Sequence, residues 1–474
     1  MRKYGINAEF SQPHHGLVVL DATRNKSSAY KLRGALASAY SAKQQGAGSV
    51  WTASAGNHGV GVAMAANLLG LSATVYVPMT APDVKVSKIE QFGARVVKVG
   101  PNFDECLVAA QALQALDSQP SAFLHPFDDQ IVAAGQGTLG IELFEHFTST
   151  IHDPAVQAVR LFVPIGGGGL IAGMTSALRH RWSEKLPPLQ IIGVVDESSP
   201  ASLLGTLFGR PVEALPDTIA DGTRVARVGQ TFLSISPLVD FIMPVPHDEI
   251  VATMRNYYRS TNDILEPSGA LALAGEALTR RHSLLPKTTS ALHYAVLTGR
   301  NVDNQTFEAV LNEESRRCAR SICRTAYQVR IPERDGELLR FLNAVSSFNI
   351  ASLTYKQQSH SSHGELSVEF EVKNSDARPL HDQLMEAFPR SESLHNTRRL
   401  LLPVGEPVAQ QYRDELVTLD DRPGSFRDYI QQLHNAGALG SVGFLFYRQP
   451  SQAGAKAQVV IGRALPPSLA GAFA

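Results

Sequence analysis

Short apolar runs alternate with amphipathic stretches along most of the chain, from Gly34 to about Val310. The runs "SVW", "ATVYV", "RVVKV", "RLFV" and "IIGVV" have the length and composition of buried strands. The stretches that follow them predict helices over Gly59–Leu69, Lys85–Phe92, Phe103–Leu116 and Leu170–Arg181, and a further one beginning at Ser199. Apolar strands separated by amphipathic helices predict an α/β fold in which helices cover both faces of a parallel sheet.

A faint internal repeat occupies the last third of the chain. It follows a polar, basic stretch, Arg316–Arg324, which is either a connector or the last turn of a helix. "IPERDGELLRFL" (Ile331–Leu342) and "LDDRPGSFRDYI" (Leu419–Ile430) each combine a strand end, an acidic turn with a glycine and an amphipathic helix. Two segments of alternating polarity follow each unit. The order of strand, helix, strand and strand, in two units of this length, predicts two small α+β modules with antiparallel sheets.

Composition limits the kinds of protein this chain can be. With 474 residues, 44 % of them hydrophobic and 18 % charged, it is expected to be globular with two or three domains. The net charge of −1 gives no support for nucleic acid or an anionic membrane as a partner. No apolar run approaches the roughly 20 residues that cross a bilayer. Cys106, Cys318 and Cys323 lack metal-ligand spacing, and His14, His15 and His58 are expected to be structural. We therefore expect no metal and a cytoplasmic location.

One lysine stands at the junction of an extended segment and a helix. In "SSAYKLRGAL", Lys31 directly precedes the residues with helical periodicity. Such a lysine is either an ordinary solvated amine or a nucleophile presented by the helix start. The glycine-rich stretches later in the chain decide between these two interpretations.

The first of these stretches is "TASAGNHG", Thr52 to Gly59, at the end of a predicted strand. Small residues allow a ligand to approach the backbone, and the next helix offers unpaired N–H donors. The turn suits a carboxylate, and Asn57 is free to hydrogen-bond a planar group above it. Taken alone, such a turn more often only solves the packing of a strand against a helix.

The second stretch, "PIGGGGLIAG", contains four consecutive glycines, Gly166 to Gly169. We expect a purely structural turn to need one or two glycines, so four predict a cradle of N–H groups for a phosphate. The spacing excludes a nucleoside triphosphate P-loop, and no acidic ribose partner supports a dinucleotide. A compact monophosphate is the better ligand.

Two more stretches, "EPSGALALAG" (Glu266–Gly275) and "VLTGRNVD" (Val296–Asp303), could each be only a turn. Thr298, however, ends an apolar strand where its hydroxyl could meet a ring nitrogen. A lysine, a phosphate cradle, an asparagine loop and this hydroxyl together imply pyridoxal 5′-phosphate.

At this point the chain resembles a known family, the fold-type II pyridoxal-phosphate enzymes, and most closely the biosynthetic threonine dehydratases (threonine deaminases). Matching stretches run in the family's order from about Ala29 to Asp303: "YKLRGA", "TASAGNHG", "FGARVVKVGPNFDE", "FLHPFDDQIVAAGQGTLGIEL", "VPIGGGGLIAG", "ADGTRVARVGQTF" and "EPSGALALAG". The resemblance implies two open parallel-sheet subdomains followed by two ACT-like regulatory modules. The expected boundaries are 1–318 for the catalytic domain, 325–405 for the first module and 406–474 for a divergent second module.

The resemblance also implies roles for individual residues. Lys31 would hold the cofactor aldehyde as a Schiff base and later act as the base, and Tyr30 would pack beside the ring. Asn57 would bond the phenolic oxygen and Thr298 the pyridine nitrogen. The phosphate would be held by Gly166, Gly167, Gly168, Gly169 and the Leu170 amide. The substrate carboxylate would be received by Ser54, Ala55, Gly56, Asn57 and His58.

The implied activity is β-elimination of L-threonine to 2-oxobutanoate and ammonia, in isoleucine biosynthesis, with serine or a modified hydroxy amino acid as other substrates. Ala55 stands where serine racemases of this fold carry a second base, so racemisation is expected to be poor. By resemblance the effector is isoleucine and the assembly a dimer or tetramer. The competing hypothesis is a degenerate or regulatory protein whose ACT-like modules bind an amino acid.

Several residues depart from the family pattern. Ala29 replaces a serine before the lysine, Val195 replaces a glutamate in the strand "IIGVVD", and the segment before the first strand is short. Arg300 follows Gly299 where a small residue is typical, and we expect it to bring a cation near the pyridine end of the cofactor.

Overall fold

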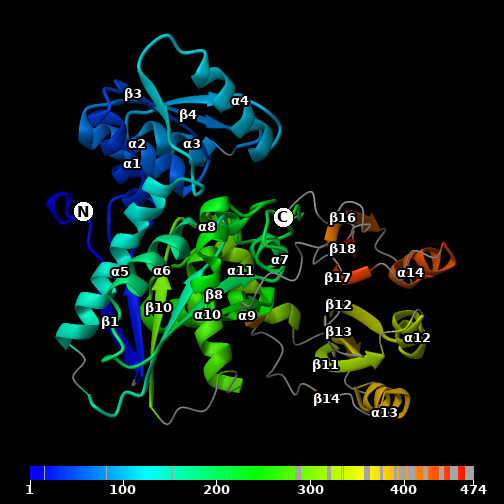
Figure 1. The fold of residues 1–474 in the computed structure, drawn as a ribbon. Helices are drawn as coiled ribbons and strands as arrows, with labels where there is room; N and C mark the ends of the chain where they lie inside the picture. The colour runs from blue at the N-terminus through cyan, green and yellow to red at the C-terminus, as the bar shows by residue number, and fades with distance from the viewer. Residues whose placement is uncertain are drawn as a thin grey trace.

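The computed structural model has three sheets (Figure 1). Two are built from strands in the front two thirds of the chain, one of them with a two-residue edge strand from the tail, and the third lies in the tail. It describes residues 1–14, 16–81, 83–150, 153–214, 216–282, 285, 290–317, 322–332, 334, 336–356, 363–373, 377–388, 392–393, 402–403, 412–419, 425–436, 442–448 and 457–464. Cys318 and Gly424, and the expected domain boundaries at 318, 405 and 406, lie outside the described residues.

The larger α/β domain contains a seven-stranded sheet in the order β1-β2-β10-β7-β8-β9-β15. Its five inner strands are parallel, and the edge strands β1 and β15 run antiparallel to their neighbours. The strands are β1 (Glu9–His14), β2 (Leu17–Asp21), β7 (Ala158–Pro164), β8 (Leu189–Asp196), β9 (Phe241–Val245), β10 (Ala291–Leu297) and β15 (Leu402–Pro403).

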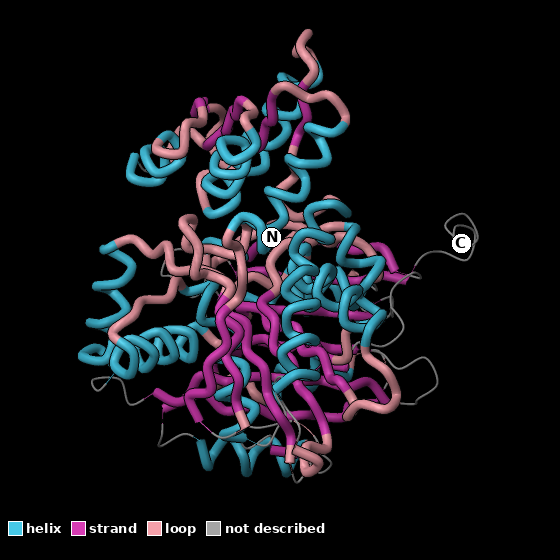
Figure 2. Tube along the Cα trace, turned by 90° about the vertical axis from the view of Figure 1, so that its left-hand side faces the viewer, coloured by secondary structure: helices cyan, strands magenta, loops and turns pink. Residues whose placement is uncertain are grey.

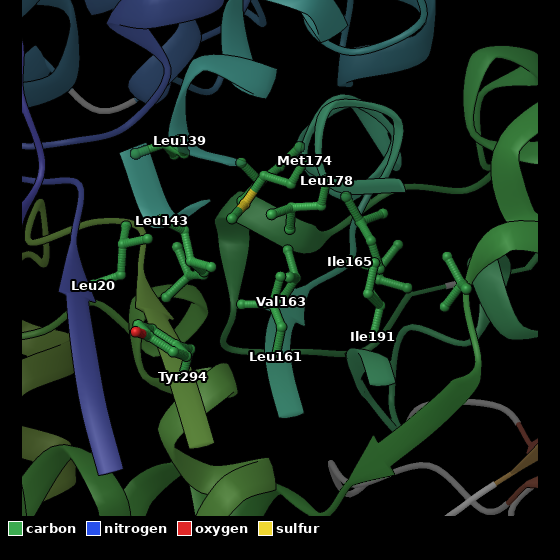
Figure 3. Close-up of a cluster of buried hydrophobic side chains, with 14 of the residues drawn as sticks. Leu20, Leu139, Leu143, Leu161, Val163, Ile165, Met174, Leu178, Ile191 and Tyr294 are labelled. Atoms are coloured by element: carbon green, nitrogen blue, oxygen red, sulfur yellow. The ribbon is translucent and has the colours of Figure 1, made fainter. Parts of the chain in front are cut away.

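Helices cover both faces of this sheet, as the pattern of apolar strands predicts (Figure 2). They are α5 (Gln130–Thr150), α6 (Gly169–Arg181), α7 (Ala201–Phe208), α8 (Gln230–Ile235), α9 (His247–Thr261), α10 (Pro267–His282) and α11 (Asn304–Arg317), with one-turn helices η2 (Asp221–Thr223) and η3 (Ser236–Leu238). On one face, Leu161, Val163 and Ile191 of the strands pack against Leu143 of α5 and Met174 of α6 (Figure 3).

The smaller α/β domain has a four-stranded parallel sheet in the order β5-β4-β3-β6. It consists of α1 (Leu32–Gln44), β3 (Ser49–Ala53), α2 (Asn57–Leu69), β4 (Ser72–Val77), α3 (Asp83–Glu90), β5 (Arg95–Lys98), α4 (Phe103–Ala115) and β6 (Ser121–Phe123), and η1 (Arg2–Tyr4) precedes it. The predicted helices therefore agree with α2, α3, α4 and α6 to within a few residues. The two open parallel sheets of the expected fold class are confirmed.

Helix α5 joins the two domains, running from the small domain down beside the large sheet (Figure 1). Glycines bring it close to a helix of each domain: a Cβ at Gly135 would lie 2.7 Å from Arg33 O, and one at Gly137 would lie 2.7 Å from Gly173 O. The sequence pattern did not predict α5. The apolar and small residues of α5 are distributed around the helix, so its sequence has no single apolar stripe that would mark it as amphipathic.

The tail shows the predicted order of strand, helix, strand and strand twice. Its elements are β11 (Ile322–Pro332), α12 (Glu337–Ala344), β12 (Asn349–Lys356), β13 (His363–Lys373), α13 (Ala377–Ala387), β14 (Glu392–Ser393), β16 (Tyr412–Leu419), α14 (Ser425–Asn435), β17 (Val442–Arg448) and β18 (Ala457–Ala464). The two units share one seven-stranded sheet, β14-β11-β13-β12-β17-β18-β16, because β12 pairs with β17. The sequence pattern did not predict this shared sheet.

One face of the tail sheet is covered by its own helices, and the opposite face of the second unit contacts the large domain. Leu445 and Tyr447 of β17 pack among α12 and α14. Phe446 of the same strand, with Val460 of β18, instead packs against Leu204 and Phe208 of α7. Alternation of side chains along a strand thus places one set in the tail core and the other against the large domain.

Candidate active site

A cavity of about 360 Å³ lies between the small and large domains, at the carboxyl ends of their parallel strands. Loops after strands at this edge of an α/β sheet are where ligands bind. All of the residues expected to serve the cofactor or substrate line this cavity: Tyr30, Lys31, Ser54, Ala55, Gly56, Asn57, His58, Gly166, Gly167, Gly168, Gly169, Leu170 and Thr298.

Lys31 is the N-cap residue of α1, and its side chain enters the cavity from the small domain. Its Nζ donates to the carbonyl oxygen of Pro126 at 2.7 Å and lies 5.4 Å from the centroid of the Tyr30 ring. Burial lowers the pKa of this amine to about 8, against an opposing contribution from the Glu266 carboxylate. Lys31 is therefore not an ordinary solvated amine.

The lowered pKa predicts how Lys31 reacts with an aldehyde. With a pKa of about 8, about a tenth of the amine is unprotonated at pH 7 and about nine tenths at pH 9. The rate at which cofactor-free protein takes up pyridoxal phosphate should rise with pH and level off above 9, because only the unprotonated amine attacks. Stopped-flow absorbance across this range measures the midpoint. Glu266→Gln should move the midpoint downward, and a rate still rising steeply at pH 10 would contradict the assignment.

The Ser54–His58 loop joins β3 to α2. Ser54 Oγ accepts from the Gly56 N–H at 3.2 Å, which fixes the turn in which Gly56 is the N-cap of α2. His58 is 2 % exposed, and its Nε2 lies 3.1 Å from the carbonyl oxygen of Leu124. Because a carbonyl can only accept, Nε2 carries the proton. Burial and the nearby Lys31 lower the pKa of His58 to about 3, so the ring is neutral.

Asn57 belongs to a polar network that connects the two domains. Its Nδ2 donates to Glu266 Oε1 at 2.7 Å, and its Oδ1 accepts from Asn301 Nδ2 at 2.6 Å. The Asn301 N–H and the Ser268 hydroxyl also donate to the Glu266 carboxylate. The side chain of Asn57 is thus fixed at the cavity wall by groups of the large domain.

Glu266 is a site residue that the sequence analysis missed. It is 7 % exposed, and burial raises its pKa against the opposing effect of its hydrogen bonds from Asn57 and Ser268. The carboxylate sits among donors at the start of α10, near Lys31. The sequence did hold a signal for Glu266, which directly precedes a proline at the start of an apolar, glycine-containing helix. Such a helix is buried, so a glutamate at its start is expected to be buried with it.

The glycine turn of the large domain is packed tightly on every side. A Cβ would lie 2.7 Å from Thr223 Cα at Gly166, 2.2 Å from the Phe127 ring at Gly167, 2.2 Å from Phe232 Cβ at Gly168 and 2.7 Å from Phe127 O at Gly169. Gly168 also has a φ of +94°. A side chain at any of the four positions would therefore clash with its neighbours, so packing is a second reason for the glycines besides a phosphate cradle. The turn still ends at the N-terminus of α6, where unpaired N–H groups face the cavity.

Thr298 ends β10 and lines the cavity, where its Oγ1 donates to Ser268 O at 3.2 Å. Arg300 does not lie where the sequence analysis expected it. Its Nη2 donates to Asp21 Oδ2 at 2.6 Å and to the Tyr257 hydroxyl at 3.1 Å, so the guanidinium is held by β2 and α9. The expectation of a cation near the pyridine end of the cofactor is wrong, because Asp21 draws the side chain away from the cavity wall.

The residues present fit a phosphate-bearing aldehyde. An amine of lowered pKa, a helix N-terminus bare of side chains and a hydroxyl at a strand end all face one cavity. The model of the family described as "Pyridoxal-phosphate dependent enzyme" matches residues 7–295. The chain belongs to this family.

A second model, described as the C-terminal regulatory domain of threonine dehydratase, matches residues 316–399 of this pyridoxal-phosphate-dependent enzyme. The L-threonine ammonia-lyase of Geobacter sulfurreducens is 34 % identical over 76 % of the chain and 87 % of its own length. The biosynthetic L-threonine dehydratase of Pasteurella multocida is 34 % identical over 69 % of the chain and 60 % of its own length.

Solved structures of a threonine deaminase and a serine racemase are also similar to the chain. The processed form of threonine deaminase isoform 2 from Solanum lycopersicum superposes with a TM-score of 0.55 at 32 % identity, covering 63 % of the chain and 78 % of that structure. Maize serine racemase gives a TM-score of 0.53 at 27 % identity, covering 64 % and 89 %. In the part of the chain that the structure describes, no helix is both long and apolar enough to cross a membrane.

Proposed function

We propose that the protein is a threonine dehydratase that converts L-threonine to 2-oxobutanoate and ammonia, with serine or a modified hydroxy amino acid as secondary substrates. The observation that carries this proposal is the meeting of Lys31 and the Gly166–Gly169 turn in one cavity of a chain that belongs to the pyridoxal-phosphate-dependent enzymes. Relatives named for threonine deamination, at 34 % identity, support the choice of substrate.

Each group of cavity residues is proposed to hold one part of the cofactor. Lys31 would bind the aldehyde, Asn57 the phenolic oxygen and Thr298 the pyridine nitrogen, beside Tyr30. The phosphate would be held by Gly166, Gly167, Gly168, Gly169 and Leu170. When bound, the cofactor supplies an electron sink for the bonds at the substrate's α-carbon.

The chain's own residues would then bind the substrate and move its protons. The α2 N-terminus, with Ser54, Ala55, Gly56, Asn57 and His58, would receive the substrate carboxylate through its N–H donors. The Lys31 amine, with its pKa of about 8, would take the α-proton. Ala55 has no group that could carry a proton, which favours elimination over racemisation.

The test is an assay of 2-oxo acid and ammonia release from threonine, serine and their O-modified forms by the holoenzyme. We expect threonine to be the best substrate, with 2-oxobutanoate and ammonia in equal amounts. A colourless protein that takes up no added pyridoxal phosphate would contradict the proposal. That result would favour a regulatory protein in which the tail binds an amino acid.

We further propose that residues 1–318 form the catalytic domain and that 325–405 and 406–474 form a regulatory tail that responds to isoleucine. The match of the tail to a threonine dehydratase regulatory domain supports a role in regulation. A cytoplasmic dimer or tetramer is the expected form. Activity assayed with and without isoleucine, and the mass in solution, test these proposals.

A further inference from the structure

The five residues Asp221 to Val225, here the 221–225 segment, line the cavity from the large domain. They comprise η2 and the two residues after it. The proposed chemistry uses none of them. The segment has contacts with the small domain, with the rest of the large domain and with an apolar cluster that includes tail residues.

The first contact reaches the small domain. Asp221 Oδ2 lies 2.9 Å from Nζ of Lys85, which stands on α3. Arg224, within the segment, approaches the other oxygen of the same carboxylate at 3.2 Å. Asp221 therefore binds one cation from each domain, and both cations line the cavity. The Lys85–Asp221 pair therefore links the small domain to the large domain at the cavity wall.

The second contact is with the glycine turn and the start of α10, which line the cavity from the large domain. A Cβ at Gly166 would lie 2.7 Å from Thr223 Cα, and a Cβ at Gly222 would lie 2.5 Å from Ser268 Oγ. The Ser199 hydroxyl donates to the Thr223 carbonyl oxygen at 3.0 Å. The segment is thus pressed against the glycine turn on one side and the start of α10 on the other, so it cannot shift without moving the cavity wall.

The third contact is with the tail. Val225 packs against an apolar cluster formed by Leu204 and Phe208 of α7, Val212, and the tail residues Phe446 and Val460. Val225 also lines the cavity. Figure 1 shows α7 beside β16, β17 and β18, on the side where this cluster lies. Val225 therefore belongs both to the cavity wall and to the apolar cluster that contains the tail residues Phe446 and Val460.

We propose that Asp221 is a positioning residue that holds the small domain over the cavity through Lys85, and that the tail sheet sets the place of Asp221 through Val225. The proposal rests on the proposed function, because closure is useful only if the cavity binds substrate. Closing a site over its substrate excludes water and completes the catalytic arrangement. An effector bound by the tail would act by loosening or tightening this contact.

The first test measures KM and kcat of the holoenzyme. Asp221→Asn and Lys85→Met should each raise KM for threonine about threefold, the size expected for a partly exposed ion pair, with a smaller effect on kcat. The double variant should be no worse than either single one, because the two residues act through one contact. Asp221→Glu should restore KM. Lys98→Met is the control, since Lys98 forms an exposed pair at 2.9 Å with Asp83 within the small domain.

The second test measures amide hydrogen exchange and does not depend on turnover. Asp221→Asn should speed exchange in α3, and Phe446→Ala should speed it in both the 221–225 segment and α3. Exchange in α3 unchanged in both variants, or additive KM effects in the double variant, would overturn the proposal. If threonine is not a substrate at all, the exchange measurement still shows whether Asp221 holds α3 in place. Failure of the proposed function can therefore be told apart from failure of this inference.

Discussion

Replacing Lys31 with alanine is expected to abolish threonine turnover, by about a thousandfold or more, and to remove the visible-edge absorption of the holoenzyme. Lys31 is proposed both to bind the cofactor aldehyde and to move the α-proton, and general acid–base catalysis alone contributes roughly 10²–10⁴. Steady-state assay and the absorption spectrum after reconstitution and dialysis measure the two effects separately.

Lys88→Ala is the matched control for this experiment. Lys88 also lines the cavity, and burial also lowers the pKa of its amine, but its Nζ is bonded to Asn301 Oδ1. This variant should keep the absorption. A Lys31→Ala protein that stays yellow, or loss of colour in the control alone, would show that the wrong amine has been assigned.

The largest effect on stability is expected for Arg33→Met. The Arg33 side chain is 1 % exposed, and its Nη1 and Nη2 lie 2.6 Å and 3.0 Å from the two carboxylate oxygens of Glu142 on α5. Removing one partner of a buried pair leaves an uncompensated charge and costs roughly 3–5 kcal/mol. We expect a loss of this size in the free energy of the first unfolding transition in urea.

Arg227→Met provides the comparison for this measurement. Arg227 pairs with Glu213 at 2.7 Å, but its side chain is 64 % exposed, so its loss should cost at most about 1 kcal/mol. Arg33→Met combined with Glu142→Leu should recover much of the lost stability, because no charge then remains buried. Equal losses for the buried and the exposed arginine would contradict this account.

Much of the α/β fold could be predicted because its signals are local. Strands β3 and β7 are mostly apolar, and the helices after them begin within two residues of the predicted positions. The position of Lys31 was predictable for the same reason, since an extended segment gives way to a helix at that residue. Because the carboxyl ends of parallel strands lie at one edge of a sheet, the turns that follow these strands meet at one cavity.

What could not be predicted depends on contacts between distant elements. Glu266 becomes a site residue only because Asn57 and Asn301 approach it from elsewhere in the chain. Arg300 leaves the cavity because Asp21, nearly 280 residues earlier, lies opposite it. The glycine turn has no room for side chains because Thr223, Phe127 and Phe232 pack against it. None of these neighbours is visible in the local pattern.

The pairing of β12 with β17, and the contact of Phe446 and Val460 with α7, have a consequence for how this protein can be desensitised. Deleting the second unit would strip β12 of a hydrogen-bonding neighbour and uncover the apolar surface of α7, which invites aggregation. Truncation is therefore a poor route to an enzyme that no longer responds to the proposed effector. Single substitutions in the contact between Phe446, Val460 and α7 are the better route, because they leave both surfaces covered.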